Sequence, residues 1–265
     1  MKSQILSCLS PAYPWKEHFR FFPSIGSTND HIRTLAKAGA PHGTVVIADH
    51  QTRGHGRRGR SFHSPEGVGV YLSILLRPDC QPTELMHLTC AAAVAMCDAV
   101  EKAAGFRPGI KWTNDLVSSK RKLGGILTEL GFTPQGKLDY AIIGVGINVR
   151  QQPGDFPEDI QNMAGSLAMI SGKDLSQAQV AAAMMDALHT MSENLLTGKK
   201  QILDTYRANC ITLHQDVVLV RSDEKRYGHA IDIDEEGALI VRFADGSTEA
   251  VNSGEVSVRG MYGYV

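Results

Sequence analysis

Apolar runs rich in β-branched residues recur along the first 150 residues of the chain, and they do not alternate strictly with helical segments. Residues 44–49 (TVVIAD), 68–76 (VGVYLSILL) and 140–149 (YAIIGVGINV) each have the composition of a buried strand. Capping and terminating residues predict helices at 27–39 and 83–104. Strands and helices mixed in this way are typical of an α+β domain.

The pattern changes after Leu213, where short strand-like runs follow one another closely. Glycine turns at residues 235–237 (EEG) and 245–246 (DG) are typical of tight hairpins. These runs predict a small β-barrel, so we divide the chain into a larger domain at 1–212 and a smaller domain at 213–265. The other predicted elements are strands at 110–112 and 122–130, a loop at 150–172, and helices at 176–198 and 199–210.

Composition is that of an ordinary soluble protein. The 27 basic and 28 acidic side chains nearly cancel, so a general affinity for nucleic acid or for an anionic membrane is not expected. The apolar run at 90–100 is interrupted by Asp98 and is too short for a membrane span. We find no secretory signal pattern and expect a cytoplasmic protein. The five cysteines show no C-x-x-C spacing, which is typical of reduced thiols.

The segment QTRGHGRRGR (51–60) holds four arginines and three glycines and joins two predicted strands. Residues 54–61 fit a P-loop with arginine in place of lysine. However, Pro65 and Gly67 follow and lead into a strand, whereas a P-loop needs a helix whose N-terminal amides face the phosphates. The run GVGINV (144–149) likewise lacks the third glycine and the helix of a dinucleotide-binding motif.

Three interpretations of this arginine loop remain. An arm for single-stranded nucleic acid would require aromatic residues among the arginines, and the loop has none. A solvated surface loop would not require three glycines. The favoured interpretation is a flexible flap over a polyanion, because glycines let a backbone fold onto a ligand and guanidinium groups match pairs of phosphate oxygens.

Other short motifs set this loop in context. They are STND (27–30), KWTNDL (111–116), RKLGGILTEL (121–130), GVGINV (144–149) and GEVSVR (254–259). In this order, with the arginine loop between the first two, the chain resembles biotin protein ligases from about Phe21 to its end. The resemblance implies a catalytic domain related to class II aminoacyl-tRNA synthetases, with a mixed sheet and helices, followed by a small SH3-like barrel. About 20 residues precede the shared core, so the chain resembles the ligase-only type that lacks an N-terminal DNA-binding domain.

The resemblance also implies a reaction in two steps. Biotin and Mg-ATP give biotinyl-5′-AMP and pyrophosphate, and a lysine of a biotin carboxyl carrier protein, such as a subunit of acetyl-CoA carboxylase, then takes the biotinyl group. Cations must screen the repulsion between a carboxylate and ATP, and a closing flap keeps the mixed anhydride from water. We find no spacing typical of a protein-held metal and expect Mg²⁺ to arrive with ATP. A homodimer is expected from family analogy alone.

Matching motifs assign the expected biotin contacts. Ser27, Thr28 and Gln51 are expected to hydrogen-bond the ureido group, although Ser27 and Thr28 are also good helix caps. Phe62 is expected to line the pocket and the flap. The further expected biotin contacts are Gly54, Tyr71, Lys122, Gly125 and Ile126.

Lys122 leads the expected catalytic residues, because it matches the lysine that contacts the biotin carboxylate and the α-phosphate. The glycines that follow it also indicate close approach by a ligand. Arg57 matches a loop arginine that is associated with pyrophosphate, and Asp115 is expected to orient the carrier lysine or accept its proton. The expected catalytic set is Lys122, Arg57, Asp115 and Lys111. The expected ATP contacts are Arg57, Arg58, Arg60, Lys111, Asn114 and Asn148, with no metal ligands.

Three positions depart from the family pattern. His55 stands where an arginine is usual, Thr113 replaces a common proline, and Phe62 replaces a common tryptophan; none of these removes a group that the chemistry requires. A lipoate-protein ligase is the nearest alternative, and the arginine loop and the C-terminal barrel favour biotin over it. A regulatory module that keeps the pocket without turnover is the alternative from another class, and intact Lys122 and Arg57 argue against it.

Overall fold

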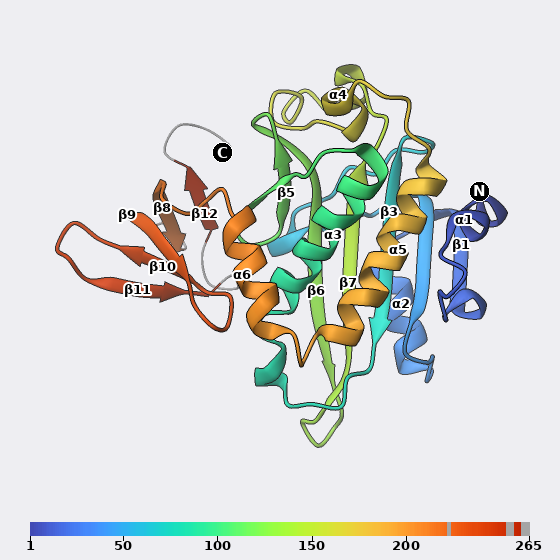
Figure 1. Ribbon diagram of the computed structural model, residues 1–265, viewed down its shortest axis with the longest axis horizontal. Helices are drawn as coiled ribbons and strands as arrows, with labels where there is room; N and C mark the ends of the chain where they lie inside the picture. Colours follow the sequence, from blue (N-terminus) through green and yellow to red (C-terminus); the bar gives the residue numbers. More distant parts are fainter. Residues whose placement is uncertain (222–223, 253–256, 261–265) are drawn as a thin grey trace.

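The protein consists of a larger part built on a seven-stranded sheet and a smaller part built on a five-stranded sheet (Figure 1). The structure, a computed structural model, describes residues 1–221, 224–252 and 257–260. The larger sheet has the order β1-β2-β3-β7-β6-β5-β4, in which β1 and β2 are parallel and the other neighbours antiparallel. This confirms the predicted mixed sheet. Its strands are β1 (Phe19–Ile25), β2 (Thr44–Gln51), β3 (Gly69–Leu76), β4 (Gly109–Lys111), β5 (Asp115–Ser118), β6 (Arg121–Phe132) and β7 (Leu138–Asn148).

Helices cover both faces of this sheet. The long helices α3 and α5 lie on one face, and α2 lies on the other (Figure 1). The helices are α1 (Lys2–Cys8), α2 (Thr28–Lys37), α3 (Leu88–Ala104), α4 (Leu167–Ser171), α5 (Gln177–Asn194) and α6 (Lys199–Asn209). Short 3-10 turns occur at η1 (Lys16–His18), η2 (Arg57–Gly59), η3 (Pro82–Leu85) and η4 (Pro153–Asp155).

The closely spaced strands after Leu213 form the predicted small β part, as a five-stranded antiparallel sheet with the order β11-β10-β9-β8-β12. Of the motif GEVSVR, residues 254–256 lie outside the described part of the chain, and the remaining three belong to the last strand. The strands are β8 (Asp216–Arg221), β9 (Glu224–Ile233), β10 (Leu239–Arg242), β11 (Thr248–Val251) and β12 (Ser257–Gly260).

Several elements differ from the sequence prediction. The helix predicted at 83–104 begins as the turn η3, and the α-helical part starts only at Leu88. The segment predicted as a loop at 150–172 contains the short helix α4. Strand β1 escaped prediction because Pro23 interrupts it, and the pairing with β2 skips this residue. A proline without an N–H is tolerated there because β1 lies at the edge of the sheet.

Strand alternation sends neighbouring side chains into two separate apolar clusters. On β2, Val45 and Ile47 pack toward α3 and α5, whereas Val46 packs beneath α2. On β7, Ile143 belongs to the first cluster and Ile142 to the second. Both faces of the central strands are therefore buried, which explains why these strands appear in the sequence as continuous apolar runs.

The apolar helix α3 belongs to the interior. Within the described residues, the stretch 82–104 is long and apolar enough to cross a membrane by length and composition alone. However, 67% of its most apolar window is buried inside the fold. Its side chains therefore pack against the apolar surfaces of the large sheet and of α5.

The two parts of the protein share contacts. Trp112 Nε1 donates to the carbonyl of Gly237 at 3.0 Å, and Arg207 donates through Nε and Nη2 to the carbonyl of Ile233 at 2.9 and 2.7 Å. The apolar cluster beneath α3 also extends into the small sheet, through residues such as Val217 and Leu239. The predicted domain boundary between residues 212 and 213 stays a prediction.

Arg77 anchors the C-terminal end of α2. Its Nε donates to the carbonyl of Ala40 at 2.9 Å and its Nη2 to that of Ala36 at 2.7 Å. Its Nη1 donates to Asp139 Oδ1 at 2.6 Å. Carbonyls at a helix end lack intrahelical donors, and charged donors satisfy them well. The guanidinium therefore fixes α2 against β7.

We expect Arg77→Ala to lower the free energy of unfolding by about 2 kcal/mol, because it removes the charged donors to one carbonyl at the end of α2, to the carbonyl of Ala40 just beyond it and to one carboxylate. Urea denaturation followed by circular dichroism measures the change. The matched control is Arg20→Ala, at an exposed position on β1, which should change stability by less than about 0.5 kcal/mol. Equal stability of both variants would show that Arg77 does not anchor the helix.

Candidate active site

A cavity of about 670 Å³ opens on the α2 face of the large sheet, between the start of α2, the arginine loop and strands β5 to β7. Its floor is made by glycines. Gly125 on β6 pairs with Gly146 on β7, and Leu127 pairs with Gly144. On β7, Tyr140 and Ile142 fill the face that lies under α2. Gly144 and Gly146 are on the same face and have no side chains, so the space above them stays open.

Larger side chains at these floor positions would collide with the walls of the cavity. A Cβ at Gly146 would meet the ring of Phe62, and a Cβ at Gly144 would meet the side-chain amide of Asn29. In the sequence analysis, GVGINV was the end of a predicted strand, a run that fails the dinucleotide-binding motif and part of a family resemblance. The structure adds that its glycines make room for the cavity.

One end of the cavity is polar and uncharged. Thr28 donates to Gln51 Oε1 twice, from its backbone N at 2.9 Å and from its hydroxyl at 3.0 Å. Gln51 Nε2 in turn donates to the hydroxyl of Ser64 at 3.0 Å. Ser27, 4% exposed, caps α2 by accepting from the N–H of Asp30 at 3.5 Å, and it also lines the cavity. Ser27 therefore both caps α2 and forms part of the cavity wall.

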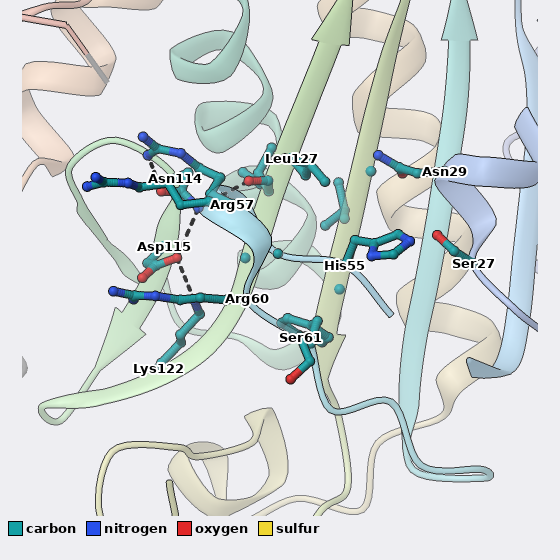
Figure 2. A pocket seen from close by; sticks show the side chains of 18 of the residues that line it. Ser27, Asn29, His55, Arg57, Arg60, Ser61, Asn114, Asp115, Lys122 and Leu127 are labelled. Carbon is teal, nitrogen blue, oxygen red and sulfur yellow. Dashed lines mark hydrogen bonds and ion pairs between the residues drawn. The ribbon is translucent and has the colours of Figure 1, made fainter. Parts of the chain in front are cut away.

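The other end of the cavity is a row of hydrogen-bonded ionic and amide groups (Figure 2). Lys122 Nζ donates to Asp115 Oδ1 at 2.6 Å, and Asn114 Nδ2 donates to the same oxygen at 3.1 Å. Asn114 Oδ1 accepts from Arg57 Nη1 at 2.7 Å. This row connects the start of β6, the β4–β5 turn and the arginine loop.

Positive charge is concentrated at this end. Among the described residues that line the cavity, Asp115 is the sole carboxylate. The cationic lining residues are Arg57, Arg58, Arg60, Lys111 and Lys122. The whole chain has a formal net charge of −1, so this excess is local. Such an arrangement attracts a ligand that carries several negative charges.

The arginine loop spans the mouth of the cavity. Gly56 N donates to the carbonyl of Arg60 at 2.6 Å, which closes the loop tip on itself. At the tip, Arg58 has a φ of 57°, in the left-handed region that residues other than glycine seldom adopt. His55 Nε2 lies 2.9 Å from Asp30 Oδ2 on α2. Arg57 contacts Asn114 on the opposite side, so the loop touches both walls.

Two pKa shifts reflect these contacts. Burial lowers the pKa of Arg57, and the nearby Asp115 carboxylate opposes that shift. Partial burial acts to raise the pKa of Asp30, but hydrogen bonds from Arg33 and His55 outweigh it and hold this pKa below its usual value. The loop therefore contacts a carboxylate on α2 that stays ionised at neutral pH.

Lys122 is held by its backbone as well as by Asp115. Its N–H donates to the carbonyl of Met163 at 2.7 Å, and its carbonyl accepts from the N–H of Gly165 at 2.9 Å. Met163 also lines the cavity. The segment predicted as a simple loop thus supports the expected catalytic lysine and forms part of the wall.

Most of the residues expected from the sequence line this one cavity. The expected residues that line it are Ser27, Thr28, Gln51, Arg57, Arg58, Arg60, Phe62, Lys111, Asn114, Asp115, Lys122, Gly125 and Ile126. The lining residues that the sequence analysis did not assign as contacts are Asn29, His55, Gly56, Ser61, Trp112, Leu127, Gly144, Val145, Gly146 and Met163. Asn29 and Trp112 stand inside motifs already noted, so the motif positions could have indicated them.

Three expected contacts, Gly54, Tyr71 and Asn148, are not among the lining residues. Tyr71 is fully buried behind Phe62, with ring centroids 6.3 Å apart, so Phe62 forms the wall there. Asn148 is also buried: its Nδ2 donates to Gly165 O at 2.9 Å and its Oδ1 accepts from Gln151 at 3.2 Å. Both polar groups of Asn148 are engaged within the protein, so this geometry gives no support to its predicted contact with ATP.

Two glycines have a packing role in place of the expected one. A Cβ at Gly54 would lie 2.5 Å from the carbonyl oxygen of Phe62, so its glycine lets the two sides of the arginine loop approach. A Cβ at Gly124 would lie 2.5 Å from the carbonyl oxygen of Gly146, across the β6–β7 pair. Gly125 lines the cavity and Gly124 does not, so the cavity supports the inference of a nearby ligand for Gly125 alone.

The described residues contain no group of three or more histidine, cysteine, aspartate or glutamate side chains that could hold a metal ion. The cavity itself offers Asp115 and His55 as donors of these kinds, from separate walls. Its donor set is therefore suited to anions and to neutral hydrogen-bonding groups.

Comparisons with known proteins cover both parts of the fold. Residues 21–148 match the biotin/lipoate A/B protein ligase family, and residues 212–259 match the biotin protein ligase C-terminal domain. The bifunctional ligase/repressor BirA of Bacillus subtilis is 35% identical over 231 residues, 87% of this chain and 71% of that protein. The biotin–[acetyl-CoA-carboxylase] ligase of Mycobacterium tuberculosis is 31% identical, over 87% of this chain and 85% of that protein.

A solved structure gives the same result. The biotin protein ligase from Aquifex aeolicus in complex with biotin and ATP superposes with a TM-score of 0.78 and 28% identity, covering 91% of this chain and 98% of that one. The resemblance inferred from the short motifs is confirmed by these matches. The chain belongs to the biotin/lipoate A/B protein ligase family and, within it, to the biotin protein ligases.

Proposed function

We propose that this protein activates biotin with ATP to biotinyl-5′-AMP and then transfers the biotinyl group to a lysine of a biotin carboxyl carrier protein. The observation that carries the proposal is the division of one cavity into a neutral end and a cationic end. Biotin has the matching chemistry, since a neutral ureido ring and a carboxylate stand at opposite ends of the molecule. The cationic end accommodates that carboxylate together with the phosphates of ATP.

In the first step, a carboxylate oxygen of biotin attacks the α-phosphorus of ATP. The bond between the α-phosphorus and the bridging oxygen to the β-phosphate breaks, and pyrophosphate leaves with that electron pair. Lys122 and Arg57 are positioned to screen the two anions from each other and to stabilise the charge that spreads over the phosphate oxygens. Mg²⁺ is proposed to enter with ATP and to neutralise phosphate charge.

In the second step, the amine of the carrier lysine attacks the carbonyl carbon of the mixed anhydride. The bond from that carbon to the phosphate oxygen breaks, AMP leaves, and the nitrogen loses a proton. Asp115 lies at the cationic end of the cavity and can orient the amine or accept this proton once ligands displace Lys122 from it. The arginine loop spans the mouth and would keep water from the anhydride in the interval.

The remaining assignments follow the geometry of the cavity. Thr28 and Gln51 are proposed to bind the ureido group, with Ser27 beside them. Lys111 is proposed to contact the nucleotide. We also propose that the protein is cytoplasmic and that its carrier is an acetyl-CoA carboxylase subunit, in line with the name of the Mycobacterium tuberculosis relative. The match of residues 212–259 to a biotin protein ligase C-terminal domain favours biotin over lipoate.

We expect pyrophosphate exchange into ATP that depends on biotin, and a carrier domain that gains one biotinyl group when biotin, Mg-ATP and the protein are combined. Isotope exchange and intact-mass spectrometry measure the two steps separately. Lipoate in place of biotin is the control and should support neither. Exchange that responds to lipoate and not to biotin would overturn the substrate assignment, and biotin binding without exchange would indicate a module that does not turn over.

We expect Lys122→Ala to slow biotin-dependent pyrophosphate exchange by roughly 10²-fold to 10³-fold, because a positioned cation is lost where charge develops. Biotin should still bind, since the neutral end of the cavity is unchanged. The matched control is Lys137→Ala, an exposed lysine next to the β6–β7 turn, which should exchange at the wild-type rate. If both lysine variants exchanged equally fast, Lys122 would have no catalytic role.

We expect Arg57→Ala chiefly to release the intermediate, because this residue ties the arginine loop to Asn114. The fraction of biotinyl-5′-AMP found free in solution, separated from protein and quantified by mass spectrometry, should rise severalfold. Arg242→Ala, at an exposed position on β10, serves as the control. An unchanged ratio of free to bound adenylate would count against closure by this loop.

A further inference from the structure

The segment that carries Asn114 and Asp115 is held from behind by groups that lie outside the cavity. Tyr206 on α6 donates its hydroxyl to the carbonyl of Thr113 at 3.0 Å. One residue earlier, the N–H of Trp112 donates to Thr212 Oγ1 at 2.9 Å. The segment therefore has a front, which faces the cavity, and a back, which rests on α6 and the residues that follow it.

Tyr206 is well suited to this back contact. Its side chain is fully buried, and it is not among the residues that line the cavity. Burial raises its pKa, so the hydroxyl keeps its proton and remains a donor at any physiological pH. A fully buried tyrosine has few rotamers open to it, and its hydroxyl therefore defines a fixed point for the carbonyl it contacts.

The carbonyl held by Tyr206 belongs to the residue next to Asn114. Thr113 is also touched from the front, where its Oγ1 accepts from Arg57 Nη1 at 3.4 Å. Asn114 then connects Arg57 with Asp115, which contacts Lys122. A shift of the Thr113 backbone would thus move the row of groups at the cationic end.

We propose that Tyr206 is a positioning residue for the reaction: its hydrogen bond to the Thr113 carbonyl fixes Asn114 and Asp115 in register with Arg57 and Lys122. This inference rests on the proposed function. The neutral end of the cavity stands on α2 and β2 and has no contact with Tyr206 among the hydrogen bonds of the described residues. Loss of the tyrosine hydroxyl should therefore affect chemistry and nucleotide binding more than biotin binding.

The test is Tyr206→Phe, which removes one oxygen and keeps the ring. We expect kcat for biotin-dependent adenylate formation to fall about tenfold or more, since small displacements of reacting groups are costly, while the KM for biotin changes less than about twofold. Tyr13→Phe is the matched control, because Tyr13 is 4% exposed and its buried hydroxyl has no partner in the structure. An unchanged kcat in Tyr206→Phe, or an equal loss in the control, would overturn the inference.

A double-mutant cycle separates positioning from a general loss of structure. If Tyr206 acts through Asn114, the combination of Tyr206→Phe with Asn114→Ala should cost clearly less in kcat than the product of the two single effects. If Tyr206 has a merely structural role, the loss of kcat in the double variant should equal the product of the two single losses. All rates are compared well below the melting temperature of each variant, so that unfolding does not enter.

Calorimetric titration with ATP gives a readout that needs no turnover. We expect Tyr206→Phe to raise the Kd for ATP severalfold and to leave the Kd for biotin unchanged, whereas Tyr13→Phe should change neither. A wild-type protein that bound ATP but formed no adenylate would refute the proposed function, and this titration would still decide the role of Tyr206. Equal ATP affinity in wild type and Tyr206→Phe would refute the role of Tyr206 alone.

Discussion

The contact between Lys122 and Asp115 is the interaction on which the site depends. Lys122 shares the cationic end of the cavity with several arginines, and like charges at close range destabilise one another unless a carboxylate or a ligand stands between them. Asp115 supplies that negative charge at 2.6 Å from Lys122. Asn114 hydrogen-bonds both Asp115 and Arg57 and so links the arginine to this pair. The cations are thus held close together before an anion arrives, and a bound anion can then replace Asp115 as the partner of Lys122.

Sheet geometry explains why a cavity with two unlike ends arises here. The neutral groups come from β2 and the first turn of α2, and the cationic groups come from the end of β4, the start of β6 and the arginine loop. Between them lie Gly144 and Gly146, on the face of β7 that carries Ile142 farther along the strand. Removing two side chains from an otherwise buried face gives the sheet a concave floor without changing its register.

Much of this site could be predicted from the sequence, for identifiable reasons. Lys122 and Asp115 could be assigned because the motifs RKLGGILTEL and KWTNDL, which contain them, match the pattern of the biotin protein ligases. Tyr71 and Asn148 also belong to motifs, but single positions do not reveal which side chains turn inward and which partners engage them. Tyr206 lies in an ordinary helical pattern, and its role depends on a backbone carbonyl 93 residues away, which no local pattern contains.

The apolar cluster that spans both sheets has a consequence for the lifetime of the protein. Because Val217 and Leu239 are buried together with the side chains under α3, cleavage or loss of the small sheet would expose the apolar surface that quality-control proteases recognise. The same event would remove Gly237, which accepts a hydrogen bond from the indole of Trp112, a residue that lines the cavity. Damage to the small sheet would therefore disturb a wall of the cavity and expose a degradation signal at the same moment.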